Sequence, residues 1–416
     1  SLPKVNAVGM GTGANTISYS RDGGLTLVGI GNSIFSVAGI RSHYNGEMWV
    51  AVGEGSVNTL AISSDGINWT GKGKVFDVRG KSVTYDNGMW IAVGEDTTSN
   101  KCIAYSTNDG VTWSYSTSSI FSTSCNDIVH TEYQGWIAVG TGTVNTMATS
   151  ADGISWTGAG LIMTTSINTI AYRGGGHILI GGNDTDKTRC LLYTTYLATP
   201  QYDTYDPDVL MSLPTTWSKI SNFQGWTEVE RIAYYDQKWT VTSDGSVDTF
   251  SYSNDVNGNA FTDKAKLTQD IKCKGTAMAP SHWITWGEDT IEAEKVKVSY
   301  DKGLTWLNIN KSTHDSYNDI FIASKPKKLL TLPLYNYTVN THMGYSSLAT
   351  SANGRNHTLY KIAYSGDGTS VAVSNSYSWG VVQVFKLNFN THKYQLEYEI
   401  KGTGTEYNMG RAITLN

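Results

Sequence analysis

The sequence of 416 residues has few charges, few prolines and no long apolar run. Charged residues make up 16%, against roughly 25% in ordinary soluble domains. The 31 basic and 36 acidic side chains give a net charge of −5. This mild acidity, with no cluster of Lys or Arg, disfavours nucleic acid as a partner. Because no stretch approaches the roughly 18 apolar residues of a membrane span, no membrane insertion is expected.

Cysteine and histidine are also scarce. The four cysteines, Cys102, Cys125, Cys190 and Cys273, are too far apart for a zinc-binding CxxC pair. They are expected to fill the core or to form at most one bridge. The eight histidines show no HxH or HExxH spacing, so no metal and no cofactor is predicted. The chain starts at Ser1 without a signal-peptide core, which predicts a trimmed precursor or a residue left by cloning.

Glycine and aromatic residues are abundant, and they recur at a fixed period. Met48 to Gly53 (MWVAVG) returns as Met89 to Gly94 (MWIAVG) and as Gly135 to Gly140 (GWIAVG). The tryptophans of these copies are 41 and 46 residues apart. A period in the forties that is filled with short apolar strands is typical of one four-stranded propeller blade per repeat.

A second motif follows the third strand of each repeat. Its copies are Ser63 to Trp69, Ser106 to Trp113, Ser150 to Trp156 and Ser299 to Trp306, with a variant at Ser20 to Thr26 that lacks the tryptophan. Asp is expected to accept backbone N–H bonds, Gly to adopt positive φ, and the aromatic residue to anchor the fourth strand. The residues assigned to this structural role are Asp22, Asp65, Asp109, Asp152, Asp301, Trp69, Trp113, Trp156 and Trp306.

These segments resemble the Asp-box, or BNR, repeat of sialidase-like and photosystem-assembly-factor-like β-propellers, over about residues 1–310. The resemblance implies that the Asp-box turns serve the fold at the periphery. It also implies that function lies on the opposite face, in the loops that join second to third strands and one blade to the next.

The strand pattern predicts an all-β fold, a single β-propeller domain over residues 1–416. First strands are expected near 40, 83, 128, 170, 232, 276, 320 and 362, and at Arg411 to Asn416. This gives about nine four-stranded blades, or eight if residues 316–355 form none. The first blade is shared between 1–30 and 408–416, so pairing of the N- and C-terminal strands closes the ring. An irregular insertion at 194–216 is either a partner-binding arm or a loop packed over its neighbour.

Ten of the 13 tryptophans have a structural place in the repeats. The candidate binding residues are the other three, two carboxylates and two insertion tyrosines: Trp226, Trp286, Trp379, Glu288, Asp289, Tyr202 and Tyr205. Carboxylates recur in the second-to-third-strand loops: Glu54, Glu95, Asp96, Asp184, Asp186, Glu288, Asp289, Glu292 and Glu294. They fit a glycosidase pair, a cation site or, as we expect, a solvated rim.

No catalytic residue is assigned. A sialidase needs an arginine cluster, and none of the eight arginines lies in the Arg-Ile-Pro context of that family. The sequence therefore predicts a non-enzymatic display or assembly module that binds a protein or glycan partner through its loops. Its composition favours an extracellular, cell-surface or virion component. The alternative is a glycoside hydrolase that uses carboxylates at the channel rim.

Overall fold

The computed structural model divides the chain into two compact units, residues 1–326 and 327–416. It describes residues 4–98, 101–117, 120–131, 134–174, 176–195, 217–220, 226, 228–243, 249–253, 261, 263–265, 272–288, 296–309, 313–323, 330–334, 337–341, 349–350, 356–357, 359–364, 370–375, 381–388 and 393–401. Backbone alone is described for 195, 263–265, 288 and everything from 330 on.

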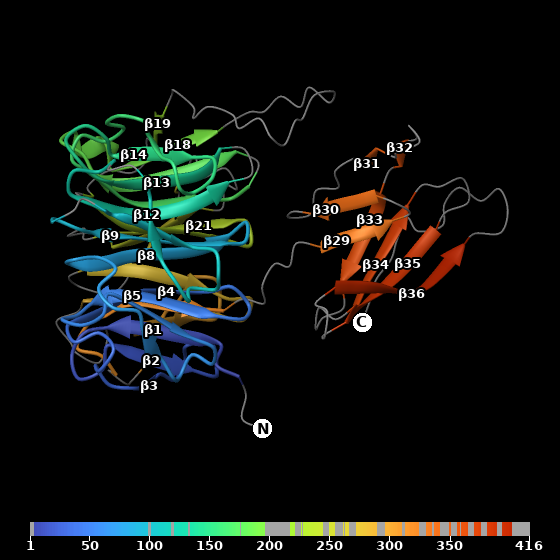
Figure 1. Cartoon of the computed structure of the whole chain (residues 1–416), viewed down its shortest axis with the longest axis horizontal. Coiled ribbons are helices and arrows are strands. Elements are labelled where there is room, and N and C mark those ends of the chain that lie inside the picture. The colour runs from blue at the N-terminus through green and yellow to red at the C-terminus, as the bar shows by residue number, and fades with distance from the viewer. Residues whose placement is uncertain are drawn as a thin grey trace. The chain divides into compact units, whose positions relative to one another are not determined.

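The described strands of the first unit form seven antiparallel groups of four, which we call blades 1 to 7, and single pairings of β5 with β8 and of β9 with β12 join blades 2 to 4 into one sheet. Figure 1 labels many of these strands. Blade 1 contains β28 (Tyr317–Ile322), β1 (Ala7–Gly11), β2 (Ile17–Ser20) and β3 (Val28–Gly29). Blade 2 contains β4 (Ala38–Tyr44), β5 (Trp49–Glu54), β6 (Leu60–Ser63) and β7 (Thr70–Gly71). Blade 3 contains β8 (Arg79–Asp86), β9 (Met89–Glu95), β10 (Ile103–Ser106) and β11 (Ser114–Tyr115). Blade 4 contains β12 (Ser124–Thr131), β13 (Gly135–Thr141), β14 (Met147–Ser150) and β15 (Thr157–Gly158).

The remaining blades follow the same order. Blade 5 contains β16 (Ser166–Tyr172), β17 (His177–Asn183), β18 (Leu191–Thr195) and β19 (Ser218–Lys219), with the 3₁₀ turn η1 (Lys187–Arg189) before β18. Blade 6 contains β20 (Val229–Tyr235), β21 (Lys238–Ser243), β22 (Phe250–Ser253) and β23 (Asp263–Ala265). Blade 7 contains β24 (Lys272–Met278), β25 (Trp283–Glu288), β26 (Val296–Ser299) and β27 (Leu307–Asn308). Residues 196–216 of the predicted insertion lie outside the described residues.

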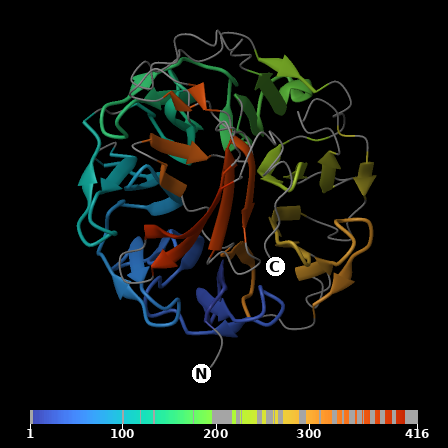
Figure 2. The same ribbon diagram turned by 90° about the vertical axis from the view of Figure 1, so that its right-hand side faces the viewer.

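The seven inner strands form a ring. Each of β4, β8, β12, β16, β20 and β24 contacts the next inner strand, and β28 contacts β4. Figure 2 shows these blades arranged around a centre. A ring of antiparallel blades, each shielding the next, is the arrangement of a β-propeller.

Blade 1 corrects the predicted closure and blade count. β1 pairs with β2 along one edge and with β28 along the other, so both of its edges are occupied. The closing strand is therefore Tyr317–Ile322, and the prediction that Arg411 to Asn416 takes this place is wrong. The segment near 320 is the inner strand of blade 1 instead of opening an eighth blade. Residues 408–416 themselves lie outside the described residues.

The described residues of the second unit form two hairpins and one four-stranded antiparallel sheet. The hairpins pair β29 (Leu330–Leu334) with β30 (Tyr337–Thr341) and β31 (Ala349–Thr350) with β32 (Asn356–His357). The sheet contains β33 (Leu359–Tyr364), β34 (Ser370–Asn375), β35 (Val381–Asn388) and β36 (Lys393–Lys401). The strand predicted near 362 thus exists, but it lies in a separate unit, whereas the sequence predicted one domain.

The propeller core lies between the blades. A tryptophan at the first or second position of the second strand is buried in blades 2, 3, 4 and 6. It pairs across the sheet with an aromatic residue of the first strand, as in Tyr44 with Trp49, whose ring centroids are 4.6 Å apart. Such cross-strand aromatic pairs stabilise a sheet. All four cysteines are free and buried, which confirms their role as core residues. No helix among the described residues is long and apolar enough to span a membrane.

Candidate functional site

Two ion pairs fill the centre of the ring. Nη1 of Arg231 in blade 6 lies 2.6 Å from Oδ1 of Asp319 in blade 1. Arg41 in blade 2 forms the equivalent pair with Asp127 in blade 4. Each arginine therefore reaches past one blade to the next, and all four side chains are largely buried.

The blade that each arginine passes has a small residue on its inner strand. Ser82 of blade 3 accepts a hydrogen bond from Arg41 at 2.7 Å and donates one to Asp127 at 2.8 Å. Gly275 of blade 7 has no side chain, and a Cβ there would lie 2.4 Å from the ring of Trp286. The centre of the channel is thus occupied by the protein's own charges.

Every inner strand has a β-bulge near its start, and in blades 1, 4 and 5 the bulge links its blade to the next. The bulged residue of blade 4, Asn126, donates from Nδ2 to the carbonyl of Ile167 in blade 5 at 2.9 Å. The next residue, Asp127, accepts a bond from the backbone N–H of Ile170 at 3.2 Å. A bulge leaves backbone groups unpaired, and here the preceding blade satisfies them.

The same pair of bonds recurs from blade 5 to blade 6 and from blade 1 to blade 2. Asn168 and Asn318 donate to the carbonyls of Val229 and Gly39 at 3.1 and 2.9 Å. Thr169 and Asp319 accept from the next blade's N–H groups at 3.2 and 3.1 Å. None of these residues was predicted from the sequence to have a special role. The signal was present, because Asn-Asp or Asn-Thr stands before Ile in three first strands.

The Asp-box turns have the predicted hydrogen bonds. Oδ1 of Asp65 accepts the backbone N–H groups of Ile67 and Asn68, both at 2.8 Å. Gly66 has a φ of +75°, which glycine adopts readily. Nε1 of Trp69 donates to the Gly66 carbonyl at 3.2 Å. Asp22, Asp152 and Asp301 accept equivalent bonds.

One assignment in these turns is wrong. In blade 3 the side chain that accepts the turn N–H, from Thr112 at 2.9 Å, belongs to Asn108. Asp109 instead has a φ of +56° and serves as the extra residue of the longer turn. Lys302 has the same place in blade 7, with a φ of +58°.

The candidate binding tryptophans that the structure describes are buried. Trp226 is 2% exposed and packs in the core with Cys190, and Trp286 is 1% exposed. The Trp286 ring lies 5.5 Å from the guanidinium carbon of Arg231, a cation–π contact. Both rings therefore serve the fold and neither offers a surface to a ligand. Glu288 ends β25 opposite Lys272. Trp379, Asp289, Tyr202 and Tyr205 lie outside the described residues.

The rim carboxylates of blades 2 and 3 form a compact ion-pair group. Arg79 lies 3.3 Å from Glu54 and 3.1 Å from Glu95. Lys81 is a second neighbour of Glu95 at 3.9 Å. Burial, partly offset by Glu95, lowers the pKa of this lysine. Glu54 and Glu95 are therefore neutralised by neighbouring cations, as expected for carboxylates that stabilise the fold.

The carboxylates of blade 5 shape a loop. Asp184 is buried and accepts the backbone N–H groups of Thr164 and Asp186 at 3.2 and 2.9 Å. Asp186 caps η1, and its Oδ2 lies 2.8 Å from Nζ of Lys219. Hydrogen bonding to Lys219 holds the pKa of the Asp186 carboxyl far below its usual value. Among the described residues, no group of three or more His, Cys, Asp and Glu could hold a metal ion.

The loops that join second to third strands are fixed by the segment that enters the first strand. In blade 3 the Asp77 carboxylate accepts the N–H groups of Thr97 and Thr98, both at 2.9 Å. A hydroxyl takes this place in three other blades, with N–O distances of 2.9 to 3.0 Å. These bonds are Ser56 to Ser36, Thr143 to Ser122 and Thr185 to Thr164. We call these four second-to-third-strand loops the rim loops.

An Asn-Thr pair holds the other end of the rim loops in blades 2 and 4. Oδ1 of Asn58 accepts the N–H of Gly73 at 2.9 Å, and the hydroxyl of Thr59 donates to the Phe76 carbonyl at 3.2 Å. Asn145 and Thr146 repeat these bonds in blade 4. The tips between these anchors are open to solvent, since Val57 is 68% and Val144 71% exposed.

Comparisons with known proteins give no family. No family model and no curated protein matches the chain. The solved structures that it resembles include a chain of the "Crystal Structure of Mitotic Checkpoint Complex", with 10% sequence identity and a TM-score of 0.49. The match covers 68% of this chain and 81% of that chain. The Asp-box resemblance therefore stays a prediction from the motifs, and the propeller assignment rests on the strand pairings described above.

Proposed function

We propose that the seven-bladed unit is a non-enzymatic scaffold that binds a protein partner on its rim loops. The observation that carries this proposal is the repeated anchoring of these loops by Ser36, Asp77, Ser122 and Thr164. A loop that is fixed before binding loses little conformational entropy in the complex.

The chemistry of the tips favours a protein partner. They present valine, serine and threonine side chains, with Val57 and Val144 at 68% and 71% exposure. Short side chains lose little rotamer freedom when they are buried, and an exposed valine gains from contact with another apolar group. A glycan partner, and a place on a virion or cell surface, are hypotheses that rest on composition alone.

The experiment compares two double variants of the full chain. Val57→Arg with Val144→Arg changes the rim loops, whereas Val111→Arg with Leu304→Arg changes Asp-box turns, where these side chains are 53% and 70% exposed. Immobilised chain captures proteins from the native source, and each captured protein is then titrated against all forms. We expect the rim variant to weaken binding at least about tenfold and the turn variant to leave it unchanged.

Two results would contradict the proposal. The first is that both double variants bind the captured protein as the wild type does. The second is turnover of a fluorogenic glycoside by the wild type that is lost in Glu54→Gln or Glu95→Gln, which would favour the hydrolase alternative. Circular dichroism of each variant checks that the ring has folded.

A further inference from the structure

The Asp-box tryptophan packs against the preceding blade. In blade 7 the ring of Trp306 lies edge-on to Phe250 of blade 6, with centroids 5.4 Å apart. Phe250 is the first residue of β22, the third strand of its blade. Trp69, Trp113 and Trp156 likewise pack into clusters that contain residues of the blade before. An indole ring thus fills the space between successive blades.

Blade 1 lacks this indole. Its turn aligns with that of blade 7 from Ser20 and Ser299 onward, so Leu27 stands where Trp306 stands in blade 7. On the preceding blade, Val296 is the first residue of β26, as Phe250 is of β22. Both members of the contact are therefore smaller at the junction of blades 7 and 1.

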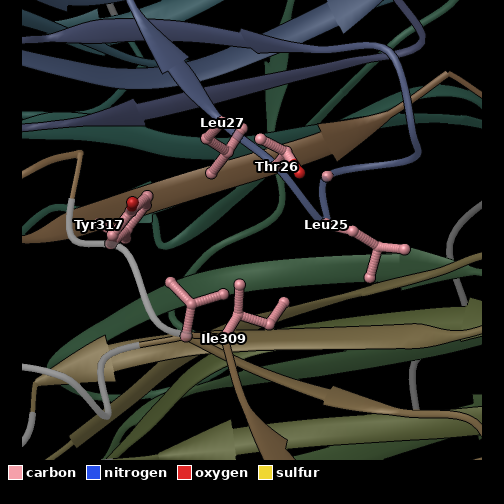
Figure 3. Close-up of a pocket in the computed structure, with 7 residues that line it drawn as sticks. Leu25, Thr26, Leu27, Ile309 and Tyr317 are labelled. Carbon is pink, nitrogen blue, oxygen red and sulfur yellow. The ribbon is translucent and has the colours of Figure 1, made fainter.

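A cavity of about 160 Å³ lies at this junction. It is lined by Leu25 and Leu27 of blade 1, Val296 and Ile309 of blade 7, and Tyr317 of β28. Figure 3 shows Leu25, Leu27, Ile309 and Tyr317 around this space. Most of the lining side chains are apolar, and Thr26 and Gly24 add polar groups to the lining. The Tyr317 hydroxyl accepts the N–H of Thr313 at 3.1 Å in its own loop. Apolar cavities of about 150 Å³ are large enough for benzene.

The cavity lining also includes the glycine of the Asp-box turn. In the four complete turns the indole N–H donates to the carbonyl of the turn glycine at 2.9 to 3.2 Å. The equivalent glycine of blade 1 is Gly24, which lines the cavity. Among the hydrogen bonds found in the described part of the chain, none is donated to the Gly24 carbonyl. The cavity is therefore lined by apolar side chains and by the glycine whose carbonyl binds an indole N–H in the other turns.

We infer that the junction of blades 7 and 1 is a binding site for an indole ring. The ring stacks between Leu27 and Val296 and donates its N–H to the Gly24 carbonyl. It comes from a free indole compound or from a tryptophan side chain of a partner. The site shares no residue with the rim loops, so this inference does not depend on the proposed scaffold function.

Calorimetric titration of the full chain tests the inference with three probes. Indole is expected to bind, and indene, which has the same shape without the N–H, about threefold to tenfold more weakly, the range expected for one hydrogen bond. N-acetyltryptophanamide distinguishes the sources. If it binds as indole does, the site takes a tryptophan side chain, and if only indole binds, the site takes a free compound.

Filling the cavity provides the decisive variant. Leu27→Trp restores the indole that the other turns have, so we expect it to abolish indole binding and to raise the unfolding temperature. Leu161→Trp, at a side chain that is 47% exposed, is the matched control and should bind indole like the wild type. Val296→Phe fills the cavity from the other side if Leu27→Trp does not fold. No heat of binding at millimolar indole, or unchanged binding in a folded cavity-filling variant, would overturn the inference.

Discussion

Arg231 and Asp319 belong to blades 6 and 1, yet Nη1 and Oδ1 of these side chains are only 2.6 Å apart. The pair passes over Gly275. Among the residues that follow the bulge in the seven inner strands, Gly275 is the one without a side chain. With Arg41 and Asp127 it places four charged side chains at the inner strands of the ring. A buried charge is tolerated only with its partner, so these pairs fix which blades face one another.

Removing one member of this pair should be costly. We expect Asp319→Ala to lower the free energy of unfolding by about 3–5 kcal/mol, because it leaves Arg231 buried without its carboxylate. Urea unfolding measures the change. Asp236→Ala is the control, since its pair with Lys302 is more than half exposed, and such pairs contribute about 0–1 kcal/mol. Equal losses in the two variants would contradict the structural role of the pair.

The turn of blade 3 tests whether Asn108 or Asp109 accepts the hydrogen bond of the Asp-box turn. Asn108→Ala should lower the free energy of unfolding by about 1–2 kcal/mol, because it removes the acceptor for the Thr112 N–H. Asp109→Gly should leave stability unchanged or raise it by up to about 1 kcal/mol, since Asp109 has a φ of +56°. Thermal unfolding of both variants measures these changes. A larger loss of stability in Asp109→Gly than in Asn108→Ala would support the predicted role of Asp109.

Acid should destabilise the ring through His314, which is buried, and His43, which is partly buried. Burial lowers the pKa of His43 and that of His314 from 6.5 to about 4. Below pH 6.5 the unfolded chain takes up protons that the folded chain does not. The free energy of unfolding should thus be highest above pH 6.5. Between pH 6.5 and pH 4 it should fall by about 1.4 kcal/mol per pH unit for each histidine. Below pH 4 these histidines should cause no further change.

His43 is the simpler of the two to test, because replacing His314 would also remove hydrogen bonds. His314 stands over Gly11 where Phe35 stands over Gly53, and its ring nitrogens bond to the Ser18 hydroxyl and the Asn15 carbonyl. Urea unfolding at pH 7, 5.5 and 4 should show a smaller acid loss for His43→Leu than for the wild type. An identical pH profile for this variant would exclude His43 as a source of the acid loss.

Closure by β28 predicts where the chain can be cut. A chain that ends at residue 326 should keep a cooperative unfolding transition, because β28 and all seven blades are retained. A chain that ends at residue 311 should lose it, because the edge of β1 is left unpaired. Near-ultraviolet circular dichroism reports the tryptophan packing of each. A folded ring in the shorter chain would rule out β28 as the necessary closing strand.

Local features were predictable because they depend on neighbours in the sequence. The turn at Ser63 to Trp69 contains its own acceptor, glycine and indole donor, so its hydrogen bonds follow from seven consecutive residues. The buried second strand at Trp49 was recognisable for the same reason. The error at Asp109 arose because two adjacent residues both suit an Asx-type turn, and one extra residue shifts the acceptor by one position.

The ion pairs between inner strands were not predicted, because their partners come from blades that are far apart in the sequence. Arg41 forms an ion pair with Asp127, which is 86 residues away, and no local sequence pattern connects the two residues. The binding role expected for Trp286 was wrong for a related reason. Gly275 on the neighbouring strand leaves room for the ring near the channel centre, and this complementarity appears only when the strands are paired.

The sequence by itself determined that the repeats form strands, where the strands turn and which residues build each turn, since these properties come from contacts within one blade. Only the tertiary structure decided how many blades make the ring and which strand closes it. Ile232-Ala233-Tyr234 and Ile362-Ala363-Tyr364 are identical, yet the first lies in the ring and the second in another unit. A strand's residues fix its two faces, but the partner along its open edge is chosen by the fit and charge of the whole assembled ring.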